Sequence, residues 1–161
     1  MNRRALIIAT VMSLVSSGSA SFAQGHGHDG AKVISTPEDV QWQPAPAIFP
    51  QGMKIAYLYG DLGKHEPFTI RVMMPANSVI APHTHNLDEM LTIISGDLDH
   101  YTGPKMKPSE GLHMEAGGFV HLPVNMGHAL KAGDGGAILQ VSGVGPFGMT
   151  YIDPKDDPRH K

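Results

Sequence analysis

Cysteine is absent from this 161-residue chain, which excludes disulfides, thiolate metal ligands and cysteine nucleophiles. Aromatic residues make up only 6% of the sequence, and neither sign of charge dominates, since Lys and Arg total 12 and Asp and Glu total 15. The cations are scattered singly, so we do not expect nucleic acid as a partner. No apolar run reaches the roughly 20 residues that a membrane-spanning helix needs.

Glycine, proline and histidine are abundant instead. The 19 Gly and 13 Pro residues favour a fold with many turns and argue against a helical bundle or coiled coil. Ten histidines stand against five Phe and one Trp, which is an unusual ratio. Because imidazole binds metals and titrates near neutral pH, this composition indicates metal chemistry or pH sensing.

The N-terminal 23 residues have the three parts of an export signal. Arg3 and Arg4 carry the positive charge, an apolar run covers 5–15, and Ser21-Phe22-Ala23 has the small-x-small pattern of a cleavage site. We therefore expect residues 1–23 to be removed as a signal peptide. The mature protein is then expected to be periplasmic or secreted, with no membrane anchor after cleavage.

The remainder of the chain is expected to contain a short leader and one domain. Residues 24–35 are rich in Gly and His and predict a flexible leader, in which His26 and His28 are incidental rather than a metal shuttle. Residues 36–161 have the length of a single domain with one core. That domain begins with Thr36-Pro37-Glu38-Asp39, which predicts one or two helical turns ending by Trp42.

Short β-rich runs separated by Gly, Pro and Asp follow from residue 53 onward. Between Phe68 and Met73 the apolar side chains alternate with Thr69 and Arg71, which is the period of a strand with one face in the core. Regularly spaced short strands predict an all-β sandwich or barrel. We expect strands over 54–59, 68–74, 90–94, 97–101, 119–122, 137–142 and 149–152.

Two segments carry the residues that suit metal binding. His83 and His85 are two apart on an extended segment, so their imidazoles share a face. Glu89 has the same parity, and a short turn after His85 would bring its carboxylate beside them. Two His and one carboxylate with open positions are typical of non-haem iron and related sites. His128, after the turn-like 123–127 segment, is a fourth candidate that spacing alone does not place.

These segments resemble the two motifs of the cupin superfamily. In the first motif, Gly-x5-His-x-His-x3,4-Glu-x6-Gly, the chain matches at His83, His85, Glu89 and Gly96 and has Asn77 at the first glycine. In the second motif, Gly-x5-Pro-x-Gly-x2-His-x3-Asn, the chain matches at Gly117, Pro123 and His128 and has Asn125 and Ala132 at the other two positions. Asparagine tolerates positive φ, so we expect Asn77 and Asn125 to form turns.

The resemblance implies a single cupin β-barrel, or jelly roll, whose metal-site core spans about residues 53–152. It implies one divalent transition metal held by His83, His85, Glu89 and His128, with one or two coordination positions open. Such ligands accept Fe, Mn, Cu, Ni and Zn alike, so the identity of the ion stays open. A homodimer is also implied, because members of the family commonly pair through edge strands.

Two functions are compatible with such a site. One is a metalloenzyme that acts on a small molecule, as a dioxygenase-like enzyme, a lyase or an isomerase, with Glu89 as a ligand or a base. The other is a non-catalytic cupin that binds or senses a ligand through the metal. His100 and His113 could face the pocket, but the favoured interpretation is that they are structural or surface histidines. The further candidates for the pocket are Arg71, Met90, Tyr101, His121 and Gln140.

Overall fold

The computed structural model describes residues 30–160, and residues from Ile34 onward form one compact unit. The predicted signal peptide and the leader up to residue 29 lie outside the described residues. Among the described residues, no helix has the length and apolar character needed to span a bilayer. Nine strands are present: β1 (Gln43–Pro44), β2 (Lys54–Tyr59), β3 (Pro67–Met74), β4 (Val79–His85), β5 (Glu89–Thr102), β6 (Leu112–Glu115), β7 (Phe119–Leu122), β8 (His128–Val144) and β9 (Met149–Tyr151).

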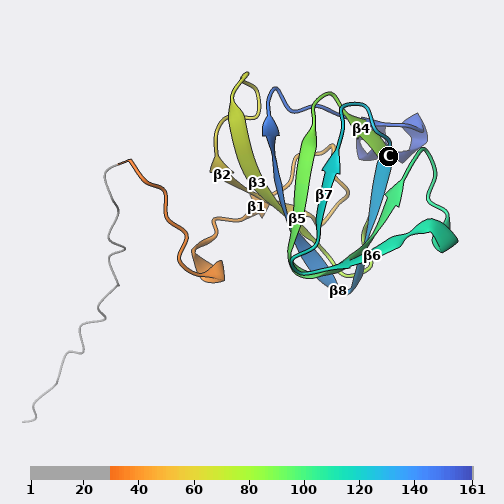
Figure 1. Cartoon of the computed structure of the whole chain (residues 1–161), viewed down its shortest axis with the longest axis horizontal. Helices are drawn as coiled ribbons and strands as arrows, with labels where there is room; N and C mark the ends of the chain where they lie inside the picture. Colours follow the sequence, from red (N-terminus) through yellow and green to blue (C-terminus); the bar gives the residue numbers. More distant parts are fainter. Residues whose placement is uncertain (1–29, 161) are drawn as a thin grey trace, which may run out of the picture. The chain divides into compact units, whose positions relative to one another are not determined.

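The strands pair antiparallel in one strongly curled sheet (Figure 1). Its main path is β1-β2-β3-β8-β4-β9, while β5 pairs with β6, β7 and β8. Strand β8 is central, since its first residues pair with β4, its last residues pair with β3, and β5 runs along nearly its whole length. The long strands β5 and β8 therefore belong to both sides of the curled sheet. This architecture confirms the expected all-β jelly roll.

Several strands differ in length from the prediction. Strands β2 and β7 have the predicted bounds, but 90–94 and 97–101 belong to the single strand β5. Pairing of β5 with β8 shifts register around Ser95 and Gly96, where φ of Gly96 is +72°. The glycine therefore marks a bulge inside one strand rather than a turn between two. Likewise, 137–142 is only part of β8.

Within residues 30–160, helical structure is confined to four single 3-10 turns: η1 (Pro37–Asp39), η2 (Pro108–Glu110), η3 (Pro154–Asp156) and η4 (Pro158–His160). At η1, the backbone N–H of Thr36 donates to Oδ2 of Asp39 over 2.9 Å, which caps the turn. The turn ends at Asp39 and does not reach Trp42, because Gln43–Pro44 pairs with β2 as β1. The predicted N-terminal helical turn is thus present but shorter.

The core lies inside the curl of the sheet. Along β3, Phe68, Ile70, Val72 and Met74 are buried and alternate with more exposed residues. Inward-facing residues of β5 and β8, such as Leu91 and Leu139, pack against them. Full burial of each such side chain contributes about 1.5–3 kcal/mol, so the apolar layer stabilises the framework that carries the polar site.

Two turns have the conformation expected from the sequence. Asn77 and Asn125 have φ of 59° and 63°, which confirms that both adopt the left-handed region. The backbone N–H of Asn125 donates to the carbonyl of His85 over 2.8 Å. This bond joins the β7–β8 turn to the end of β4, so the turn holds the start of β8 beside the histidines of β4.

Candidate metal centre

Three histidines meet inside the barrel. His83 and His85 lie on β4, and His128 is the first residue of β8 and the direct cross-strand partner of His83. One ring nitrogen from each histidine lies within 4.8 Å of the other two. All three side chains are buried, with 1–5% of each residue exposed. Pairing of β4 with β8 therefore brings together residues that are 43–45 positions apart.

Backbone carbonyls orient two of these rings. Nδ1 of His83 lies 2.8 Å from the carbonyl oxygen of Ala81, and Nδ1 of His85 lies 2.9 Å from that of Gly148. Because a carbonyl only accepts, Nδ1 of each ring carries the proton. Nε2 of each neutral ring then keeps its lone pair and is the atom available to a metal.

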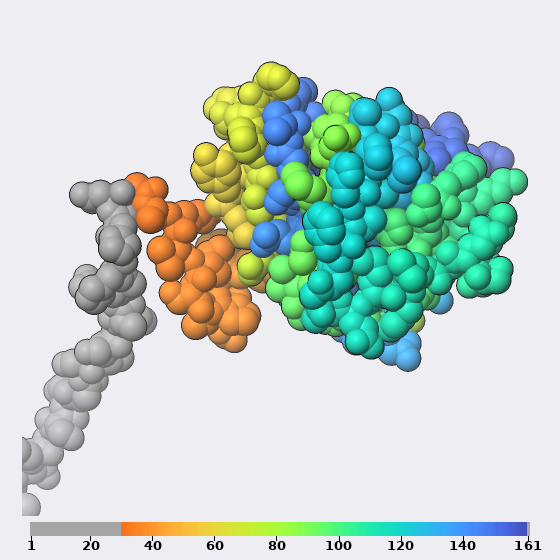
Figure 2. Space-filling view, viewed as in Figure 1, coloured from red at the N-terminus to blue at the C-terminus, as the bar shows by residue number. Residues whose placement is uncertain are grey.

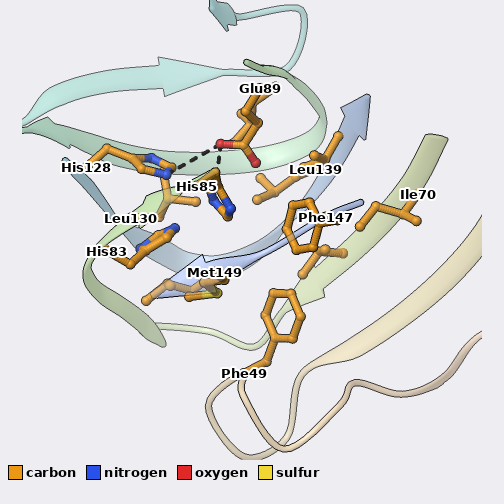
Figure 3. A pocket seen from close by; sticks show the side chains of 14 residues that line it. Phe49, Ile70, His83, His85, Glu89, His128, Leu130, Leu139, Phe147 and Met149 are labelled. Atoms are coloured by element: carbon orange, nitrogen blue, oxygen red, sulfur yellow. Dashed lines mark ion pairs between the residues drawn. The ribbon is translucent and has the colours of Figure 1, made fainter. Parts of the chain in front are cut away.

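Glu89, at the first position of β5, lies beside two of the three histidines. Its Oε2 lies 3.6 Å from Nε2 of His85 and 3.4 Å from Nε2 of His128 (Figure 3). Only 3% of Glu89 is exposed, and burial raises the pKa of this carboxyl to about 8. Burial also lowers the pKa of His83 to about 3 and lowers the pKa values of His85 and His128. The three rings are therefore neutral at physiological pH.

The donor set fits a divalent cation. Oε2 of Glu89 and both ring nitrogens of His128 are buried without a hydrogen-bond partner among the described residues. An unpaired buried polar atom is costly, and here the ring nitrogens of His85 and His128 lie within 3.6 Å of the Glu89 carboxyl oxygen. A cation bound there would compensate Glu89 Oε2 and His128 Nε2. Three imidazoles and a carboxylate form a ligand set that first-row transition metals accept.

The cavity beside these ligands is small and apolar. Its volume is about 20 Å³, which holds roughly one water-sized species. Phe147 covers one side, with its ring centre 4.8 Å from that of His85. The remaining wall is also apolar and includes Phe49, Ile70, Leu130, Leu139 and Met149 (Figure 3).

A much larger groove, of about 1050 Å³, lies outside the cavity. Phe49 lines both spaces and therefore forms the partition between them. The loop that carries Phe49 is anchored where the Tyr151 hydroxyl donates to the carbonyl of Ile48 over 2.9 Å. The groove carries both apolar and polar side chains, including Pro44, Ala47, Gln51, Lys54, Tyr151 and Asp156.

Comparison with solved structures identifies this architecture. The polyketide cyclase RemF from Streptomyces resistomycificus superposes with a TM-score of 0.64 at 14% identity, over 80% of this chain and 90% of RemF. An RmlC-like cupin from Shewanella frigidimarina superposes with a TM-score of 0.54 at 15% identity, over 71% of this chain and 91% of that protein. The chain has the cupin fold.

A lyase also superposes on this chain. The DMSP lyase DddQ from Ruegeria pomeroyi superposes with a TM-score of 0.53 at 21% identity, covering 66% of this chain and 56% of DddQ. No family model and no curated protein matches the sequence. These similarities show the fold of the chain, and inside that fold the three expected histidine ligands lie together with Glu89 beside two of them.

Five other residues expected near the pocket do not line the cavity. Arg71 donates from Nε to Oε1 of Gln140 over 3.2 Å across β3 and β8. These two residues and Met90, which is 42% exposed, alternate along their strands with cavity-lining residues. A change of one position along a strand moves a side chain to the opposite face, so these three lie on the outside of the cupin barrel.

Tyr101 and His121 are also outside the cavity. Tyr101 is buried, but it packs under Gly111, where an added Cβ would lie 2.7 Å from the tyrosine Cε1. His121 lies on the outer face of β7, with its Nε2 3.6 Å from Oδ2 of Asp88. Their sequence positions near the ligands did not indicate which face of each strand is covered.

The sequence analysis missed several residues that surround the ligands. Phe49 and Phe147 come from loops and therefore have no strand periodicity that would reveal them. His100 is 4% exposed, and its ring centre lies 5.5 Å from that of His128. Its parity matches that of buried Leu98 on β5, so strand alternation was the signal that could have found it.

Proposed function

We propose that this protein binds one divalent transition metal through His83, His85, His128 and Glu89 and acts with it on a small molecule. The single observation that carries the proposal is the convergence of three buried imidazoles, two of which lie within 3.6 Å of a buried Glu89 oxygen that has no hydrogen-bond partner among the described residues. Fe, Mn, Cu, Ni and Zn all remain candidates for the ion.

The reaction class that fits best is an oxygenase, a lyase or an isomerase. A bound ion would supply Lewis acidity or redox chemistry to a chelating oxygen of the substrate. The neighbours described as a polyketide cyclase and a DMSP lyase, together with an oxalate oxidase of the same fold, support small-molecule chemistry.

The residues around the proposed metal have different roles. Hydrogen bonds from Nδ1 of His83 and His85 to the carbonyl oxygens of Ala81 and Gly148 hold these two rings in place. Phe147 excludes water from one side of the site. Glu89 is either a ligand or a general base, and a pKa of about 8 suits proton transfer near neutral pH.

The size of the cavity restricts what reaches the ligands. A space of about 20 Å³ admits only the reacting end of a substrate. The groove outside Phe49 is large enough for the remainder, and its polar side chains, which include Lys54, Tyr151 and Asp156, suit a molecule with hydroxyl or other polar groups. We propose a small chelating compound, such as a hydroxy acid or a diketone, as the substrate class.

A second function is favoured by the composition of the cavity wall. Apart from the four proposed ligands, all residues that line the cavity are apolar, within the part of the chain that is described. No additional acid or base therefore touches the reacting space. This fits a cupin that binds or senses a ligand through the metal without turnover.

Elemental analysis of the protein from its native source, before metal is added, is the primary test. We expect about one transition metal per chain, and loss of that metal in His85→Ala and His128→Ala variants. His113→Ala is the matched control, because that imidazole is 57% exposed and pairs with Asp99. Iron, manganese or copper would support redox chemistry, whereas no metal, with none taken up on reconstitution, would overturn the proposal.

Turnover separates the two functions. We expect substrate-dependent oxygen uptake or product formation in a screen of chelating hydroxy acids, diketones and phenols, with loss of this signal in His85→Ala. Saturable binding of one of these compounds to the metal-loaded protein without any product would favour the sensing function.

We also propose that the protein is exported after removal of residues 1–23. The charged, apolar and small-residue segments of the N-terminus support this proposal. The N-terminal sequence of protein from the periplasmic or secreted fraction should begin near Gln24. Intact Met1 on the functional soluble protein would contradict export.

A further inference from the structure

Two ring nitrogens next to the centre are not explained by the proposed ion. Among the described residues, four buried side-chain nitrogen or oxygen atoms lack a hydrogen-bond partner: Glu89 Oε2, His100 Nε2, His128 Nδ1 and His128 Nε2. Ligation by Glu89 and by Nε2 of His128 would compensate two of them. Nδ1 of His128 and Nε2 of His100 would remain, and native proteins rarely leave such atoms unpaired.

These two atoms belong to neighbouring side chains. His100 on β5 is the cross-strand partner of Leu130 on β8, so it is the diagonal neighbour of His128 on the same inward face. The ring centres lie 5.5 Å apart, with 34° between the ring planes. This separation places the edge nitrogens within reach of a direct bond after a small ring rotation, or of a bond through one bridging water.

The chemistry of the two atoms is complementary. When a histidine binds a metal through Nε2, its remaining proton is on Nδ1, which is then a donor that needs an acceptor. His83 and His85 each have a backbone carbonyl for this purpose, whereas His128 has none. A neutral His100 with its proton on Nδ1 offers Nε2 as that acceptor.

We propose that His100 is a positioning residue for the centre, which accepts a hydrogen bond from Nδ1–H of His128 directly or through one water. The inference rests on the proposed metal-binding function. His100 then does for His128 what the carbonyls of Ala81 and Gly148 do for the other two rings. It fixes the tautomer and the orientation of the ring and raises its basicity toward the ion.

Two substitutions at this position separate the hydrogen bond from packing. His100→Leu fills similar space and removes the acceptor, while His100→Gln keeps an acceptor oxygen near the position of Nε2. The matched control is His113→Gln, an exposed histidine on β6. Each variant and the wild type are titrated with Co²⁺ and Zn²⁺ against a competing chelator, and the metal-free proteins are compared by thermal unfolding.

We expect His100→Leu to weaken metal binding about 10–100-fold, which is typical for loss of a partner that supports a metal ligand. His100→Gln should recover most of the affinity, and His113→Gln should equal the wild type. The metal-free Leu variant should be at least as stable as the wild type, because it removes an unpaired buried nitrogen.

A spectroscopic measurement tests the bond itself. In Zn²⁺-loaded protein with 15N-labelled histidine, we expect three slowly exchanging Nδ1–H signals in the wild type and in His100→Gln. The signal of His128 should be lost or should exchange rapidly in His100→Leu. A purely structural role for His100 would not change this signal selectively.

The outcomes distinguish this inference from the proposed function. Failure of the wild type to bind either metal would overturn the metal centre, and the role of His100 with it. Metal binding by the wild type with equal affinity in His100→Leu would overturn the inference alone. Equal losses in the Leu and Gln variants would also overturn it, because the role of His100 would then be packing.

Discussion

At the residue scale, the centre combines a carboxyl that prefers to be protonated with imidazoles that prefer to be neutral. Burial raises the pKa of Glu89 to about 8 and lowers the pKa values of His83, His85 and His128. In the metal-free protein at neutral pH, the rings therefore already have free lone pairs, whereas Glu89 still carries its proton. Ligation of a metal by Glu89 has to displace that single proton.

The pH dependence of metal affinity follows directly. Below pH 8, the apparent affinity should rise about tenfold per pH unit, since one proton is released, and it should level off above pH 8. Competition with a chelator of known proton affinity measures this slope. The control variant Glu115→Gln, at an exposed position, should keep this slope, whereas Glu89→Gln should abolish the pH dependence of metal affinity. A flat wild-type profile between pH 6 and 8 would show that Glu89 is not the titrating ligand.

Stability of the metal-free protein should have a maximum near pH 6.5. The histidines have lowered pKa values when folded, so their contribution is present above pH 6.5 and is lost as the pH falls toward about 3, the value for His83. Glu89 has a raised pKa, so its contribution is present below about pH 4.5 and is lost as the pH rises through about 8.

Between pH 6.5 and 8, the free energy of unfolding should therefore decrease by about 2 kcal/mol, from 1.36 kcal/mol per pH unit for one proton. Denaturant titrations in the presence of a chelator, across pH 5–9, measure this curve. In Glu89→Gln the decrease in stability above pH 6.5 should disappear, while the loss of stability below pH 6.5 should remain. An unchanged decrease in that variant would assign the effect to another group.

At the element scale, the loop between β1 and β2 carries Phe49, and we expect this side chain to limit access to the ligands. This side chain lines the inner cavity and the outer groove, and only 9% of it is exposed. Truncation to alanine should join the two spaces. The loop is held at Ile48 by Tyr151, so the position of Phe49 depends on a strand outside the loop.

In Phe49→Ala, a bulky external chelator should therefore remove the metal several-fold faster than in the wild type. Phe49→Leu, which keeps more of the volume, should stay close to the wild type. Stopped-flow absorbance with Co²⁺-loaded protein gives the rate of metal removal for each of the three proteins. Phe49→Ala should also lower the free energy of unfolding, by no more than about 5 kcal/mol. Identical extraction rates in all three proteins would exclude Phe49 as the partition.

The β7–β8 turn is the second element that positions the site. Asn125 has φ of 63°, and its N–H bonds to the carbonyl of His85. Asn125→Gly keeps both features and should change the stability little, whereas Asn125→Ala should cost about 1 kcal/mol because alanine has a Cβ but lacks the short polar side chain by which asparagine tolerates positive φ. Urea unfolding measures both values. Equal stability of the two variants would show that the turn relaxes out of the left-handed region.

At the scale of the whole molecule, the outer face of the sheet suggests how two copies would meet. Met90 and Ile94 of β5 and Phe119 of β7 are 42%, 37% and 59% exposed on this face. Strand β7 lies on the surface that faces the viewer in Figure 2. Neighbouring exposed apolar side chains are typical of protein interfaces, so this face is where we expect the homodimer implied by the family resemblance to form.

Light scattering after size-exclusion chromatography should therefore give the mass of a dimer. Met90→Lys combined with Phe119→Lys should shift the protein to monomers, since it places charge in an apolar contact. Leu112→Lys, on the separate strand β6, is the control and should leave the dimer intact. A monomeric wild type at tens of micromolar would contradict the dimer.

Local geometry explains what could be predicted from the sequence. Alternation along Phe68–Met73 predicted the buried face of β3, and the two-residue spacing of His83 and His85 placed both rings on one face. The left-handed turns at Asn77 and Asn125 followed from residue chemistry. Each of these features depends only on neighbours within a few positions, so the sequence by itself determined them.

Tertiary structure decided which distant residues meet. His128 lies beside His83 because β8 pairs with β4, and His100 lies beside His128 because β5 follows β8 across the bulge at Gly96. Arg71 and Gln140 were expected in the pocket but lie outside, because alternation separates two faces without telling which one the fold covers. Pairing of strands far apart in sequence is set by burial of the whole core, and no local pattern contains that information.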